Sequence, residues 1–163
     1  MSAEIIERLY TAFDAKDAAG MAACYHPDVT FTDPAFGSLR GWKAAAMWHM
    51  LIERGTDLRM EHSRVQATDD TGSAHWEAWY TFSTTQRSVH NIIDASFRFQ
   101  AGRIIEHTDV FDFWRWSRQA LGAPGIFLGW SGMLSGKVNK TANQGLESWI
   151  EKNGGGPDLI PPI

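Results

Sequence analysis

Three residues near the ends of predicted strands could carry out acid–base chemistry: Asp33, His107 and Asp109. A carboxylate can accept or give up a proton during a reaction, and histidine titrates close to neutral pH. His107 and Asp109 are two residues apart in a segment with strand character, so their side chains share one face. Asp33 alternates in phase with Val29 and Phe31, which predicts that it faces inward. We interpret the two aspartates as a candidate base and acid, with His107 as a partner or proton relay.

Each of these residues also has a structural interpretation. Asp33 precedes Pro34, and Asp-Pro is a good start for a turn, so its carboxylate could simply cap the loop over 34–37. His107 and Asp109 could form a pair that only supports the fold, or lie on a hydrated outer face. A carboxylate on an apolar face is costly unless it is paired or used, and this cost keeps the functional hypothesis open.

A second polar pair, His75 and Glu77, lies on another predicted strand, and the face of this strand is ambiguous. If the pair faces inward, Trp79 does so as well and becomes a candidate substrate contact. The opposite alternation turns a more apolar set inward, and we favour it: Trp76, Ala78, Tyr80 and Phe82.

Other kinds of site find little support in the sequence. Histidines at 26, 49 and 90 could be combined with His107 and Asp109 on paper, but no His-x-x-x-His or similar metal-binding spacing exists, so no metal is expected. Phosphate-binding loops, a GxGxxG turn, a GxSxG elbow and a CxxC motif are all missing, so we expect no cofactor. The one cysteine, Cys24, fits a buried packing role.

Composition limits the partners of the chain. It has 163 residues, 44% hydrophobic and 21% charged, with a net charge of −4, which suits one globular domain. Because no dense run of Lys and Arg occurs, neither nucleic acid nor a membrane is expected as a partner. The first residues, MSAEIIERLY, carry charges where a signal peptide needs an apolar core, and no apolar run approaches a membrane span. We therefore expect a cytoplasmic protein.

The hydrophobic pattern predicts helices first and strands afterwards, which is typical of an α+β fold. Helices are predicted over 3–15, 17–25 and 42–54, with Asp17 as an N-cap and Gly55 as a stop. Strands are predicted over 29–32, 58–67, 75–82, 89–99 and 103–113. The later strands are joined by short turns, which favours an antiparallel meander.

The end of the chain has a different character. A short helix is predicted from Trp114 to Gly122 and a long one over 135–152, while residues 122–136 are rich in glycine yet strongly apolar. We expect a cone domain over 1–122 and a C-terminal extension over 123–163 that packs on the same domain or on a partner subunit. The last residues, GGGPDLIPPI, are predicted to form a loose tail.

Two segments resemble the nuclear transport factor 2-like superfamily: YHPDVTFTDP at 25–34 and GRIIEHTDVFD at 102–112. This superfamily includes ketosteroid isomerase, SnoaL-like polyketide cyclases and limonene-epoxide hydrolase, and the likeness covers about residues 4–113. The resemblance implies a cone-shaped fold in which three N-terminal helices pack on a curved, mostly antiparallel sheet. It also implies a homodimer.

The resemblance assigns roles to the candidate residues. Asp33 matches the proton-shuttling base of ketosteroid isomerase, and Asp109 matches the acid of limonene-epoxide hydrolase, although the arginine of the latter's triad is missing here. The two donors that stabilise the oxyanion in ketosteroid isomerase are not matched. Leu9 stands in place of the tyrosine, with Tyr10 turned by about 100° beside it, and Ala95 stands in place of the aspartate. Ketosteroid isomerase activity is therefore not expected.

We therefore expect a cofactor-independent enzyme that acts on a small apolar carbonyl or epoxide compound as an isomerase, cyclase or hydratase/hydrolase. The residues expected to contact the substrate are aromatic: Phe13, Phe31, Trp48, Trp79, Phe97 and Phe111. The alternative is a binding module for an apolar molecule or a dimeric scaffold without catalysis.

Overall fold

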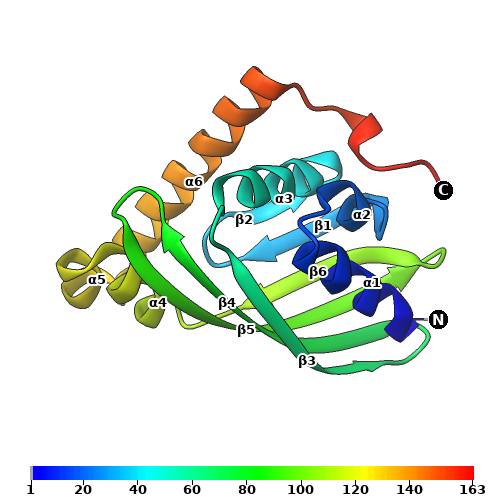
Figure 1. The fold of residues 1–163 in the computed structure, drawn as a ribbon, viewed down its shortest axis with the longest axis horizontal. Helices are drawn as coiled ribbons and strands as arrows, with labels where there is room; N and C mark the ends of the chain where they lie inside the picture. Colours follow the sequence, from blue (N-terminus) through cyan, green and yellow to red (C-terminus); the bar gives the residue numbers. More distant parts are fainter. Residues whose placement is uncertain (1) are drawn as a thin grey trace.

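The computed structural model describes residues 2–163 as one strongly curved sheet that bends around the first helices, with further helices at its end (Figure 1). The helices are α1 (Ser2–Asp14), α2 (Ala18–Ala22), α3 (Trp42–Arg54), α4 (Phe113–Leu121), α5 (Ala123–Leu128), α6 (Gly132–Asn153) and the 3₁₀ turn η1 (Pro157–Leu159). The strands are β1 (Tyr25–Asp33), β2 (Gly37–Arg40), β3 (Arg59–Ala67), β4 (Thr71–Phe82), β5 (Arg87–Gln100) and β6 (Arg103–Val110). The α+β class predicted from the sequence is confirmed.

The sheet has the strand order β2-β1-β6-β5-β4-β3. Strands β3 to β6 form the predicted antiparallel meander, and β1 joins it by pairing in parallel with β6. Long strands with a clear alternation of buried and exposed residues, such as β5, give the sheet one apolar face and one polar face. The apolar face curves around α1 and α3, which supply buried side chains such as Leu9 and Met47.

Several predicted boundaries differ from the structure. The helix expected through Tyr25 ends at Ala22, and β1 begins at Tyr25 with a shift of register before Thr30. Residues 37–40, expected to be a loop, form β2 along the free edge of β1. The predicted N-cap is confirmed, because the Asp17 carboxylate accepts a hydrogen bond of 2.8 Å from the backbone N–H of Gly20.

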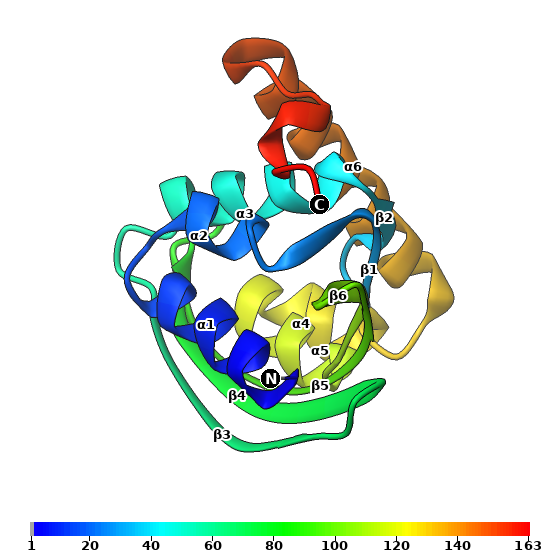
Figure 2. The same cartoon turned by 90° about the vertical axis from the view of Figure 1, so that its right-hand side faces the viewer.

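The C-terminal segments lie across one end of the space that the sheet and the first helices surround (Figure 2). From α4, Trp116 and Ala120 form a small apolar cluster with Val89 of β5, and Phe111 and Val138 pack against it. A helix over residues 123–128 was not predicted, since glycine and proline there argue against one. None of the helices described is both long and apolar enough to cross a membrane.

The final residues do not form the loose tail that was predicted. Ile160 is buried in the main core. Arg103 donates hydrogen bonds to the carbonyl oxygens of Pro161 and Pro162, at 2.5 and 2.9 Å. The apolar residues Leu159 and Ile160 therefore supply the driving force, and the arginine satisfies the carbonyl groups that follow.

Two asparagines of α6 fasten this helix to the loop that follows β1. Asn139 donates to the carbonyl oxygen of Ala35 at 3.1 Å. Asn143 donates to the carbonyl oxygen of Phe36 at 2.9 Å, and also to the carbonyl of Asn139. Because these bonds join the extension to the loop next to Asp33, they tie the position of α6 to the candidate site.

We expect the substitution Asn143→Ala to lower the free energy of unfolding by about 1–2 kcal/mol, because it leaves a half-buried carbonyl without its donor. Urea denaturation followed by far-UV circular dichroism measures this change. Asn153→Ala is the matched control, since Asn153 donates only to the carbonyl of Trp149 in its own helix and is exposed. Equal losses in both variants would show that the contact with the loop contributes nothing.

Candidate functional site

The three candidate acid–base residues meet on the apolar face of the sheet. The parallel register of β1 and β6 pairs Phe31 with His107 and Thr32 with Thr108. Continued by one residue, this register sets Asp33 beside Asp109. His107 and Asp109 are 1% and 3% exposed, so the pair lies inside the cone and not on a hydrated face. His107 and Asp109 face inward as predicted, and Asp33 is half-buried and within reach of the charge of Asp109.

A chain of hydrogen bonds fixes His107 from both sides. The indole N–H of Trp48 donates to the hydroxyl oxygen of Tyr25 at 2.8 Å, and the Tyr25 hydroxyl lies 2.8 Å from Nδ1 of His107. On the other side, Nε2 of His107 lies 2.9 Å from Oδ1 of Asp109. The Asp109 carboxylate accepts a hydrogen bond from Nε2, and the Tyr25 hydroxyl, which accepts from Trp48, can donate its own proton to Nδ1. This arrangement predicts a His107 tautomer with its proton on Nε2.

Asp109 is only partly satisfied by its protein neighbours. Its Oδ1 accepts from Nε2 of His107 and, at 3.3 Å, from the indole N–H of Trp76. Within residues 2–163, the structure gives Oδ2 no hydrogen-bond partner. The hydrogen bonds thus hold the carboxylate in one orientation while one oxygen stays available for another molecule.

Asp33 combines the structural and the functional interpretation. Its Oδ1 accepts from the backbone N–H groups of Ala35 and Phe36, at 3.0 and 2.6 Å, so it does cap the loop after β1. Burial raises the pKa of this carboxyl group to about 7; the two backbone bonds oppose the rise and the nearby charge of Asp109 adds to it. Asp33 therefore exchanges its proton near neutral pH.

Tyr10 brings a further hydroxyl group into the same interior. It is buried on α1, and its ring packs against those of Trp76 and Phe97 at centroid distances of 6.2 and 6.4 Å. Its hydroxyl has no hydrogen-bond partner among the described residues. Burial, and next the charge of Asp109, raise the pKa of Tyr10 well above its ordinary value, so it remains a donor. The rotation inferred from the sequence does not take Tyr10 out of the interior, because Leu9 and Tyr10 are both buried.

At the end covered by α4, two more polar side chains face inward. The Tyr80 hydroxyl accepts from the indole N–H of Trp116 at 2.8 Å. Burial and the charge of Asp33 raise the pKa of Tyr80 to about 12, although the Trp116 bond lowers it. Asn91 on β5 is 8% exposed and its side chain has no hydrogen-bond partner in the described chain. Helix α4 thus contacts the same polar group of residues as Asp33.

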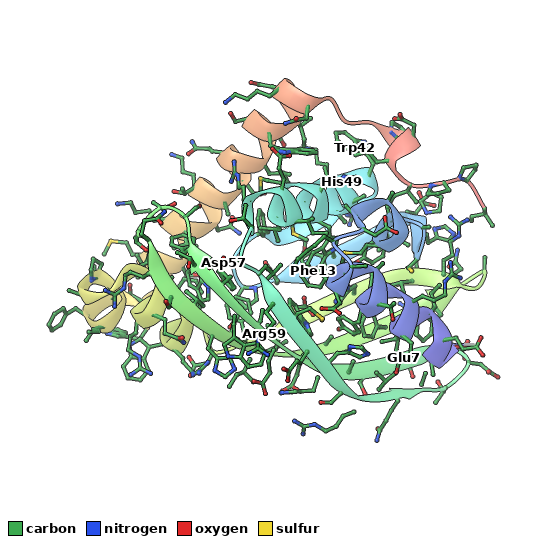
Figure 3. The ribbon with its side chains drawn as sticks, in the orientation of Figure 1. Glu7, Phe13, Trp42, His49, Asp57 and Arg59 are labelled. Carbon is green, nitrogen blue, oxygen red and sulfur yellow. The ribbon has the colours of Figure 1, made fainter. Side chains whose placement is uncertain are left out.

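Of the aromatic residues expected to contact a substrate, four lie around His107 and Trp76 in the interior: Phe13, Phe31, Trp48 and Phe97. Figure 3 shows Phe13 between the helices and the sheet. Phe111 is half-buried and packs near Trp116, at the covered end. These rings pack against one another, with Phe31 and Trp48 centroids 5.4 Å apart.

Trp79 does not face the interior, so the prediction that it contacts a substrate there is wrong. Trp79 lies on the opposite face of β4, where its ring stacks on His90 at 4.6 Å. On this face Glu77 is bonded to His75 and His90, at 3.3 and 2.6 Å. The favoured alternation is correct for Trp76 and Ala78, which are buried. Substrate contact through Trp79 from inside the cone is therefore excluded.

The sequence argument missed Tyr25, Trp76, Tyr80 and Asn91 as members of the site. Tyr25 was placed on a helix, and only the irregular start of β1 turns its hydroxyl toward His107. Trp76 and Tyr80 were in the favoured inward set, so the alternation of β4 was the signal that could have found them. Asn91 alternates with Ile93 and Ala95 on β5, which would have revealed it in the same way.

Two cavities of the described structure lie outside the cone. One is lined by residues of the β4–β5 turn, β5 and α4, and the other by residues of α1 and α2 with the residues that adjoin them. No group of three or more histidine, cysteine or acidic side chains in residues 2–163 could hold a metal ion. The candidate site is thus a buried polar cluster among aromatic rings, and its interior is narrower than the open apolar pocket that we inferred from the sequence.

Comparison with known proteins supports the superfamily. A family model described as "SnoaL-like domain" matches residues 6–107, more than half of the chain. The chain belongs to this family. The match covers β1, the meander and His107, and it ends before Asp109 and the extension. A search of curated proteins found no match.

Solved structures share the fold at low sequence identity. A nuclear transport factor 2-like protein of unknown function from Burkholderia pseudomallei is 19% identical, with a TM-score of 0.63 over 74% of this chain and 97% of that one. An epoxide hydrolase of the limonene-epoxide hydrolase type from M. tuberculosis is 16% identical, with a TM-score of 0.61 over 82% and 94%. IdmH of Streptomyces antibioticus, a candidate polyketide cyclase, is 20% identical, with a TM-score of 0.59 over 73% and 97%. These likenesses establish the fold.

The hydrogen-bond chain predicts the tautomer of His107. We expect ¹⁵N NMR at neutral pH to show its proton on Nε2, and we expect Tyr25→Phe to shift the Nδ1 resonance, because Nδ1 loses its hydrogen-bond partner, while Asp109 keeps the proton on Nε2. His62, which is partly exposed and whose Nε2 contacts Glu7, serves as the internal reference. A proton on Nδ1 in the wild-type protein would contradict the direction that we assign to the chain of donors.

The raised pKa of Asp33 predicts a specific dependence of stability on pH. Between the ordinary value of 3.8 and about 7, the folded protein holds a proton that the unfolded chain has lost. The contribution of Asp33 to stability is therefore fully present below 3.8 and is lost as the pH rises through about 7.

We expect Asp33→Asn to remove this loss, so that the variant gains on the order of 1–3 kcal/mol over the wild type between pH 5 and pH 8. Urea denaturation at both values measures the difference. Asp69→Asn, in the exposed turn between β3 and β4, is the control and should keep the wild-type pH slope. Parallel curves for Asp33→Asn and the wild type would mean that Asp33 is ionised throughout.

Proposed function

We propose that this protein is a cofactor-independent enzyme that moves protons to and from a small apolar carbonyl or epoxide compound. The observation that carries the proposal is a pair of carboxyl groups on neighbouring strands beside an aromatic interior: Asp109, which is buried, and Asp33, which is half-buried and within reach of its charge. Two carboxyl groups in different surroundings take different protonation states, so one can act as base while the other acts as acid.

In this proposal Asp109 is the base. Its Oδ1 is occupied by His107 and Trp76, which leaves Oδ2 to accept a proton from carbon or from water. His107 has protein partners on both ring nitrogens, so we assign it to positioning Asp109 and not to contact with the substrate. Tyr25 and Trp48 extend this support and hold the imidazole in the tautomer that donates to the base.

Asp33 is the acid in the same scheme. A carboxyl group whose pKa is about 7 is well suited to give up a proton near neutral pH and to regain it afterwards. One of its oxygens is held by the loop after β1, which fixes the direction of the other. The Tyr10 hydroxyl supplies a donor that could stabilise negative charge on a substrate oxygen. A second donor of the ketosteroid isomerase type is not supplied from β5, because Ala95 faces inward and Asp94 faces outward.

The second candidate function is binding of an apolar molecule without turnover. The close packing of Phe13, Phe31 and Trp48 favours it, because the interior then opens only as far as these rings move. In this case the carboxyl groups would orient a polar end of the ligand. The two candidate functions agree on the ligand class and differ on whether a proton is transferred.

The test uses two probe reactions: hydrolysis of styrene oxide, and exchange of the α-protons of cyclohexanone with D₂O, followed by NMR. We expect wild-type protein to accelerate at least one of them. Asp109→Asn and Asp33→Asn should each lower the rate by about 10²-fold or more, because each removes a proton-transfer group while keeping a similar side-chain shape. Asp94→Asn, an exposed carboxylate on the outer face of β5, should retain full activity.

Binding measured in parallel separates the two functions. Protein that binds these probes by NMR titration but turns over neither would favour the binding module over the enzyme. Turnover that survives both Asp109→Asn and Asp33→Asn would contradict the proposed chemistry even if the protein is an enzyme.

A further inference from the structure

Away from the cone interior, an open cleft of about 720 Å³ lies between the β4–β5 turn and α4. Its lining is basic and polar: Gln86, Arg87, Ser88, Arg115, Arg118 and Gln119. Three arginines thus face one cleft that contains no acidic residue. Like charges gathered in this way repel one another unless an opposite charge lies close by.

None of these three arginines has a carboxylate partner among the described residues, whereas two arginines on the outer face of the sheet do. Arg59 and Arg98 pair with Glu61 and Glu106 on the outer face of the sheet. Among the described residues, no ion pair involves Arg87, Arg115 or Arg118. Local sequence explains the difference, since residues 113–146 contain four basic residues and no Asp or Glu, in a chain whose net charge is −4. This local excess of basic residues is hidden in the overall composition.

The protein holds the three guanidinium groups in place without using most of their donors. Arg87 donates from Nε to the carbonyl of Gln119, and Arg115 donates from Nη1 to the carbonyl of His90, both at 2.7 Å. The guanidinium of Arg118 lies 4.1 Å from the ring centre of Trp114. Because each guanidinium has five N–H groups, most donors remain free.

Two further details indicate a built site. The Nε of Arg118 is buried and has no hydrogen-bond partner among the described residues. Gly122 has a φ of +70°, which favours glycine. A Cβ atom at this position would lie only 3.2 Å from the guanidinium carbon of Arg87, so the glycine leaves room for that side chain. Gln119 joins the two walls, because its side chain accepts from the N–H of His90 and donates to the carbonyl of His90. The arrangement of donors is therefore fixed before any ligand arrives.

We propose that this cleft is a binding site for a phosphate-type anion, separate from the acid–base site and independent of its function. Fixed guanidinium forks match the oxygens of phosphate and can bind two of them at once. The anion would neutralise the three arginines and satisfy the buried Nε of Arg118. Free phosphate compounds and the headgroup of an anionic phospholipid share this chemistry.

The lipid source has its own support in the neighbouring surface. Large apolar side chains are exposed on α4, on α5 and at the start of α6: Trp114, Ile126, Phe127, Leu128, Trp130 and Met133. Trp114 joins this surface to the cleft through its contact with Arg118. Tryptophan and basic residues beside apolar ones are typical of proteins that rest on a lipid surface. The experiment therefore has one arm for each source.

The first arm titrates the full-length protein with inorganic phosphate at constant ionic strength and pH, with chloride as the balancing anion. The Nε–Hε signals of arginine are followed by ¹H–¹⁵N NMR. We expect saturable shifts at Arg118, Arg87 and Arg115, and at least tenfold weaker binding in Arg118→Gln and Arg115→Gln. Arg98→Gln is the matched control, because Arg98 is already paired with Glu106, and it should bind as the wild type does.

The second arm measures sedimentation with vesicles of phosphatidylglycerol and of phosphatidylcholine. Binding to phosphatidylglycerol alone that Arg118→Gln reduces at least tenfold identifies the lipid headgroup as the source, whereas phosphate binding without vesicle binding identifies a free phosphate compound. If a variant unfolds, the mapping in wild-type protein still decides the question. The proposal fails if wild-type protein binds neither probe. It also fails if the arginine signals of the cleft do not shift with phosphate and, in addition, Arg118→Gln sediments with phosphatidylglycerol like the wild type. It fails as well if Arg98→Gln weakens binding as much as Arg118→Gln does.

Discussion

The burial of one carboxylate, that of Asp109, determines how the interior of this protein is built. A carboxylate at 3% exposure is tolerated only when donors surround it, and here the donors come from aromatic and imidazole groups. His107 and Trp76 bond to it directly, while Tyr25 and Trp48 fix the histidine. The chain of donors therefore joins α3, β1, β4 and β6 through one charged group. Removing any member would leave a buried polar atom unsatisfied, so the network constrains packing as much as chemistry.

The same carboxylate also sets the behaviour of groups that it does not touch. Its charge raises the pKa of Asp33, Tyr10 and Tyr25, in each case after burial as the larger cause. Burial and this single negative charge together keep the hydroxyl groups of Tyr10 and Tyr25 protonated, and they bring the pKa of the Asp33 carboxyl group to about 7. The interior separates into one anion and several proton donors, and this is the arrangement that acid–base chemistry on an uncharged substrate requires.

The sequence alone was sufficient for the class, the meander and the inward faces of His107 and Asp109, because alternation along a strand follows directly from backbone geometry. It was not sufficient for Tyr25. The orientation of this side chain follows from a register shift between β1 and β6, and such a shift is set by the pairing of the two strands in the folded protein. The sequence also left open which residues of β4 face inward, because Trp79 is apolar enough to do so. Its ring instead stacks on His90, and the guanidinium of Arg59 lies 3.9 Å from its centre, so the outer face satisfies it.

The segments after β6 pack against the candidate site at two points. Asn139 and Asn143 of the extension bond to the loop beside Asp33, and Trp116 of α4, which precedes the extension, bonds to Tyr80. The opposite side of α4 carries Arg115 and Arg118, which line the basic cleft. One helix thus contributes to both places. Its apolar side, through Trp116 and Ala120, packs against Val89, while Arg115 and Arg118 on the same helix line a cleft that is separate from the interior.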